Sequence, residues 1–140
     1  MSIDPSELLG RLSATLKADI APAVGDEYSR TQTFMASVIL ERLSKQIALA
    51  PDHVRAELDD MTTLHGELRE LLSDAPPAVE LAIETLGADR RVAVLDPLIE
   101  ALYAEMADAG PEESSRAAVA LDVVRPHLRR DIDRRMEIAK

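Results

Sequence analysis

Prolines divide this 140-residue chain into segments that carry apolar residues at helical spacing. The prolines are Pro5, Pro22, Pro51, Pro76, Pro77, Pro97, Pro111 and Pro126. Proline fits the first turn of a helix and disrupts the interior, because it lacks a backbone N–H, so most of these positions predict helix starts. No stretch alternates apolar and polar residues as a strand does. We therefore expect an all-α fold, an antiparallel helical bundle of five to six helices in a single domain over residues 1–140.

The first two predicted helices lie before Pro51. Asp4 can cap a helix that begins at Pro5 and ends near Pro22. A second helix is predicted after Gly25, and apolar residues cover more than half of its circumference. These residues are Tyr28, Phe34, Met35, Val38, Ile39, Leu40, Leu43 and Ile47. Such a broad apolar surface predicts the central, buried helix of the bundle.

The remaining helices are predicted to begin at or near later prolines. A third helix starts at Pro51, a shorter one ends at Gly87, and another runs from Asp96 to Gly110. The last starts near Pro111. Its apolar face comprises Ala117, Leu121, Val124, Leu128, Ile132 and Met136. Pro126 lies inside this helix and predicts a kink.

Composition and charge exclude several classes of function. The chain has no Cys, which removes disulfides and thiolate chemistry. It shows no signal-peptide pattern and no long uncharged apolar run, so we expect a cytoplasmic protein without a membrane segment. The net charge is −10, although residues 125–140 hold six basic and three acidic residues. Because an acidic body repels phosphates and only three aromatic residues are present, we expect no nucleic-acid binding.

No catalytic or cofactor motif is present. The three histidines, His53, His65 and His127, show neither Glu-x-x-His nor His-Glu-x-x-His spacing. A Gly-rich phosphate loop, a Gly-x-Ser-x-Gly sequence and kinase motifs are also missing. We expect no metal, no cofactor and no catalytic residues. The absence of known motifs argues against an enzyme without deciding the question.

Four polar residues on apolar helix faces form a candidate ligand site. His65 stands between Met61 and Leu68, where leucine would be expected, so it is either a core-edge histidine or a ligand contact. Burial would lower its pKa. A buried Arg42 would need a carboxylate partner, either within the protein or on an anionic ligand. The second alternative predicts an interhelical pocket, whose lining residues would be Tyr28, Gln32, Arg42 and His65.

The basic C-terminal segment, RPHLRRDIDRRMEIAK, has two interpretations. Its arginines suit the negative end of a helix dipole. Alternatively, Arg129, Arg130 and Arg134 form an interface that contacts an acidic surface, including that of a second copy.

The N-terminal third resembles a known group of proteins. The segments LLGRLSATLKADIAPAV and EYSRTQTFMASVILERL are similar to small helical proteins of unknown function encoded near aminoglycoside-phosphotransferase-like kinases. The resemblance covers about forty residues of the 140 and implies a bundle fold and a kinase-like partner. It assigns no catalytic residue.

Two functions remain open on the sequence. The first is a non-enzymatic interaction protein that forms a homo-oligomer or binds a partner, because apolar helix surface is abundant and chemical motifs are absent. The second is a small-molecule binder or minor enzyme that holds an anionic ligand in the interhelical pocket.

Overall fold

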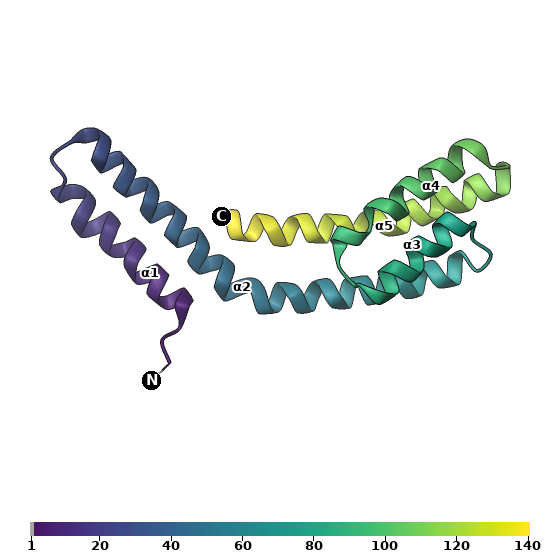
Figure 1. Ribbon diagram of the computed structural model, residues 1–140, viewed down its shortest axis with the longest axis horizontal. Coiled ribbons are helices and arrows are strands. Elements are labelled where there is room, and N and C mark those ends of the chain that lie inside the picture. Colours follow the sequence, from purple (N-terminus) through teal and green to yellow (C-terminus); the bar gives the residue numbers. More distant parts are fainter. Residues whose placement is uncertain (1) are drawn as a thin grey trace. The chain divides into compact units, whose positions relative to one another are not determined.

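The computed structural model describes residues 2–140, which form five α-helices and no strand. The α-helices are α1 (Pro5–Thr15), α2 (Glu27–Leu71), α3 (Pro77–Ala88), α4 (Asp96–Asp108) and α5 (Pro111–Ala139), shown in Figure 1. A π-helical turn, η1 (Leu16–Ile20), and a 3-10 turn, η2 (Ala21–Ala23), follow α1, and a 3-10 turn, η3 (Val92–Val94), precedes α4. The prediction of an all-α fold with five to six helices is confirmed.

The predicted helix starts are largely correct, with one exception at Pro51. Asp4 accepts a hydrogen bond from the Ser6 N–H at 2.9 Å, and Asp26 accepts one from the Ser29 N–H at 2.8 Å, so both aspartates cap helices. Pro51, however, lies inside α2, which continues without a break to Leu71. A proline removes one backbone hydrogen bond, and a long helix can absorb that loss through its remaining turns. α5 likewise continues through Pro126.

The chain divides into two compact units. Unit 1 comprises Met1–His53 with Met136–Lys140, and unit 2 comprises Val54–Arg135. The helices α2 and α5 both run through the two units. The single-domain assignment stays a prediction.

Unit 2 contains the hydrophobic core. The C-terminal part of α2 and the helices α3, α4 and α5 run in alternating directions (Figure 1). Their buried side chains are almost all aliphatic, as the shortage of aromatic residues requires. The largest are Met61, Leu64, Leu68, Ile83, Leu86, Leu95, Leu98 and Leu102. Of the apolar face predicted for the last helix, the first four residues pack in or against this core, but Ile132 and Met136 are exposed.

Unit 1 is a helical hairpin of α1 and the N-terminal part of α2 (Figure 1). The end of α5 joins it through His53, whose Nε2 lies 3.1 Å from Glu137 Oε2. Among the described residues of this unit, only Ser13, Ala21 and Ser37 are buried. The hairpin therefore has no buried large apolar side chain. No helix within residues 2–140 combines the length and apolar character needed to cross a membrane.

Unit 2 has one glycine inside α2 and one inside α3, and replacing them with alanine should change stability in opposite directions. Gly66 has no atom near the position of an added Cβ, whereas a Cβ on Gly87 would lie 2.7 Å from His65 Nε2. Alanine stabilises a helix by about 0.5–1 kcal/mol relative to glycine. We expect Gly66→Ala to raise the free energy of unfolding in urea by this amount. Gly87→Ala should lower it, because the His65 ring must move.

The double-mutant cycle with His65→Ala identifies the cause. Removing the ring should make Gly87→Ala stabilising. An unchanged loss in the His65→Ala background would contradict the steric explanation.

Candidate functional site

Small residues hold the two helices of the hairpin close together. The Ser13 hydroxyl donates to the Ser37 carbonyl oxygen at 2.6 Å, and the Ser44 hydroxyl donates to the Ser6 carbonyl oxygen, also at 2.6 Å. A Cβ on Gly10 would lie 3.3 Å from Ser44 Oγ, so glycine permits this approach. At these two contacts, bonds of this length leave no room for a leucine side chain.

A set of large aliphatic residues consequently lies on one side of the hairpin. Leu12 precedes Ser13, and Leu43 precedes Ser44, so each is turned by about 100° from the helix contact. Because α1 and α2 are antiparallel, the same turn brings both leucines to one side. The residues on this side define the hairpin face: Leu8, Leu12, Leu16, Ala36, Ile39, Leu43 and Ile47. Leu16 is half-buried, Ala36 is exposed, and the five others are 41% to 56% exposed.

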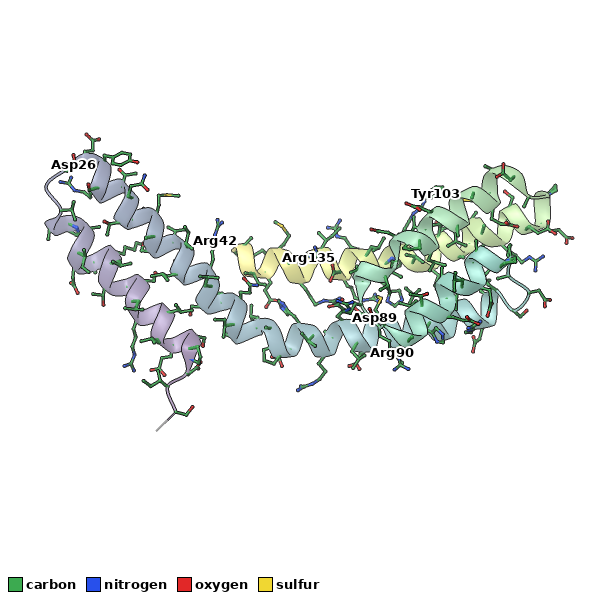
Figure 2. All side chains as sticks on the ribbon, viewed as in Figure 1. Asp26, Arg42, Asp89, Arg90, Tyr103 and Arg135 are labelled. Carbon is green, nitrogen blue, oxygen red and sulfur yellow. The ribbon has the colours of Figure 1, made fainter. Side chains whose placement is uncertain are left out.

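The prediction that the second helix is buried is wrong for its N-terminal part. Tyr28 is 72% exposed, and Gln32 and Arg42 are also exposed. Arg42 projects from the side of α2 that faces away from α1 (Figure 2). The periodicity identified the apolar surface correctly, but within the described part of the hairpin no second layer covers it. An exposed Arg42 needs no carboxylate partner.

His65, the fourth residue of the predicted pocket, belongs to unit 2 and is half-buried between α2 and α3. Its ring packs against Gly87. Burial lowers the pKa of His65, and the positive charges of Arg69 and Arg90 lower it further. The structure therefore supports the core-edge interpretation, and the expected direction of the pKa shift agrees with it.

None of the five most prominent clefts on the described surface is lined by Tyr28, Gln32, Arg42 or His65. The most enclosed of the apolar ones holds about 60 Å³ in unit 2, between Leu72, Pro76 and Leu102. An open cleft of unit 1 lies beside Lys17, whose ammonium stands 5.6 Å from the centre of the Phe34 ring. Within residues 2–140 no three His, Asp or Glu side chains gather in a way that could hold a metal ion.

A partly buried charged cluster connects α2 and α5 within unit 2. Asp60 accepts hydrogen bonds from Arg130 Nε at 3.1 Å and from Arg134 Nη1 at 2.7 Å. Burial acts to raise the pKa of Asp60, but the hydrogen bonds and charges of Arg134 and Arg130 outweigh it and hold the pKa below its usual value. Arg134 Nη2 is buried without a hydrogen bond and lies 3.6 Å from Asp131 Oδ1.

His127 is the most buried member of this cluster. Its Nδ1 accepts from Arg130 Nη2 at 2.8 Å, so the proton of the neutral ring is assigned to Nε2, which donates to Glu67 Oε2 at 3.3 Å. Each ring nitrogen has a partner. His127, with Asp60 and its two arginines, therefore forms a structural connection between two helices.

The three arginines proposed as an interface have different environments. Arg130 and Arg134 bind Asp60 within unit 2, and the Arg134 side chain is only 15% exposed. Arg129 is exposed and pairs with Asp133 one turn later. Their role as an interface stays a prediction, and Arg129 has the most exposed side chain of the three.

The sequence carries a signal for the charged cluster. His127 and Asp131 continue the buried positions Ala117, Ala120 and Val124 of α5 at spacings of three and four residues. Polar residues at core spacing predict partners on the facing helix. The serine contacts of the hairpin had no comparable signal, because isolated serines are common on helix surfaces.

Comparison with protein-family models, with curated proteins and with solved structures found no match to this chain. The resemblance to helical proteins encoded near aminoglycoside-phosphotransferase-like kinases therefore stays a prediction.

Replacing Asp60 should destabilise unit 2. Asp60→Asn removes the carboxylate that Arg130 and Arg134 share, and hydrogen bonds to charged groups contribute about 1.5–3 kcal/mol. We expect a loss of about 2–3 kcal/mol, measured by hydrogen exchange of the amides of residues 61–68. The neighbouring Asp59 is exposed, so Asp59→Asn is the matched control and should change little. Equal effects of the two variants would contradict a specific role for the cluster.

His65 should make the protein less stable in mild acid. Its folded pKa lies below the unfolded value, so the unfolded chain binds the proton more tightly. The neutral His65 ring contributes fully to the free energy of unfolding above about pH 6.5, and this contribution is lost as the pH falls below that value. We expect His65→Gln to reduce the fall in unfolding free energy between about pH 7 and 5. An unchanged pH dependence would show that His65 does not titrate differently on unfolding.

Proposed function

We propose that this chain is a non-enzymatic interaction protein of the cytoplasm that binds another protein chain through the hairpin face. The observation that carries the proposal is the contrast within unit 1. Five large aliphatic side chains of the face are exposed, while only Ser13, Ala21 and Ser37 are buried in the described part of this unit. Exposed apolar residues that gather on one surface mark protein contacts more often than scattered ones do.

The energetics of a helical hairpin support the same proposal. Isolated helices of the length of α1 are marginal in water, and in proteins the packing of an apolar face supplies most of their stability. The Ser13 and Ser44 hydrogen bonds fix the distance between the helices but bury little apolar surface. Covering the hairpin face would supply the missing apolar contact.

The alternative, a small-molecule binder with an anionic ligand, has less support. Tyr28, Gln32 and Arg42 are exposed in unit 1, and none of them lines a described cleft. A kinase-like partner is implied by the sequence resemblance alone. We therefore prefer an interaction protein, and the hairpin face is its proposed binding surface.

Photocrosslinking in the intact cell tests this proposal. A benzophenone amino acid at Leu12 points from the hairpin face, whereas one at Ala14 lies about 200° away on the same helix. Both positions are exposed, so they form a matched pair. We expect a protein adduct of defined mass from position 12 and much less from position 14.

The outcome is interpreted without knowledge of the partner. Defined adducts at position 12 that exceed those at position 14 support a protein-binding face, whether the adduct contains a second copy or another protein. No adduct at position 12, or equal adducts at both positions, would contradict the proposal.

A further inference from the structure

We infer that the hairpin face is covered by a second copy of this chain, and that two hairpins pack face to face as a four-helix bundle. The inference rests on the proposed function, and it names the partner. Helices bury an apolar stripe against a second layer, and the hairpin supplies one layer alone. A second hairpin adds the missing layer, and four-helix bundles bury their apolar positions in this way.

The distribution of charge on the hairpin favours a second copy over a charged partner. The residues of the hairpin face are all uncharged. The charged residues of α1 and of the hairpin part of α2 up to Lys45 project elsewhere, since helical spacing places them on the opposite side or at its edges. They are Glu7, Arg11, Glu27, Arg30, Glu41, Arg42 and Lys45.

An uncharged face suits self-association in this chain. The net charge is −10, so two copies repel each other through most surfaces. A two-fold interface brings the same patch of both subunits together and must therefore be self-complementary. An apolar patch without charges meets this condition, whereas a charged patch would place like charges opposite each other.

The area of the face matches the requirement of a dimer. An aromatic side chain buries about 150–250 Å² and an aliphatic one somewhat less, so a half-exposed Leu or Ile presents on the order of 80 Å². The five exposed side chains together with Leu16 and Ala36 then present roughly 500 Å². A standard interface buries about 800 Å² on each partner. In homodimers about 65% of that area is apolar, which is also roughly 500 Å².

The molar mass of the purified chain tests the inference. Light scattering after size exclusion should give twice the 15.3 kDa of one chain at micromolar concentration. The variant Leu12→Glu/Leu43→Glu places charges on the hairpin face and should give the mass of one chain. The matched variant Ala14→Glu/Lys45→Glu adds acidic groups two positions further along each helix, off the face, and should remain a dimer.

Cysteine crosslinking tests the contact without disturbing folding strongly. The chain has no Cys, so one introduced thiol can link only to a second copy. With a short bismaleimide, Leu43→Cys should yield covalent dimers, and Lys45→Cys should yield at least ten-fold fewer. Equal crosslinking at positions 43 and 45 would overturn a contact through this face. A dimer mass for Leu12→Glu/Leu43→Glu in light scattering would overturn it as well.

Failure of this inference can be distinguished from failure of the proposed function. A purified chain that stays monomeric, while Leu12 still forms defined adducts with a different protein in the cell, would overturn the second copy and retain the interaction protein. A monomer without any adduct at Leu12 would overturn both.

Discussion

Two serine hydrogen bonds determine the character of the hairpin. Because the Ser13 and Ser44 hydroxyls bond to backbone carbonyls of the opposite helix, the two backbones approach closely, with Gly10 beside the Ser44 contact. Large side chains cannot enter such a contact. Leu12 and Leu43, each directly before one of these serines, are therefore held on the surface. The apolar face of unit 1 thus follows from its polar interior contact.

In unit 2 the helices pack through large aliphatic side chains instead of serine contacts. Its part of α2 places Leu64 and Leu68 against α3 and α5, where aliphatic side chains fill the interior. Charged groups also lie there, partly buried, and Asp60 accepts hydrogen bonds from two arginines of α5. Burying charges is costly, and the cluster avoids that cost only because its members pair with one another. One long helix therefore carries an apolar surface that is covered in unit 2 and exposed in unit 1.

The sequence predicted the helices well and their environments less well. Asp4 and Pro111 marked helix starts correctly, because caps and first-turn prolines act locally. Pro51 was misleading, since the remaining turns of α2 compensate for one lost hydrogen bond. The prediction of burial was wrong for the residues around Arg42. Periodicity shows which face of a helix is apolar, but it does not show whether the same chain covers that face. The pairing of His127 depends on tertiary contacts between α2 and α5, which no local pattern specifies.

Hydrogen exchange at several protein concentrations tests the central claim, that the hairpin lacks its own core and is stabilised by contact between chains. If a second chain covers the hairpin face, protection of the α1 amides over residues 9–15 should rise with concentration, because association adds to the free energy of opening. The amides of residues 61–68, in the core of unit 2, should change far less. Strong α1 protection that is independent of concentration would contradict the account.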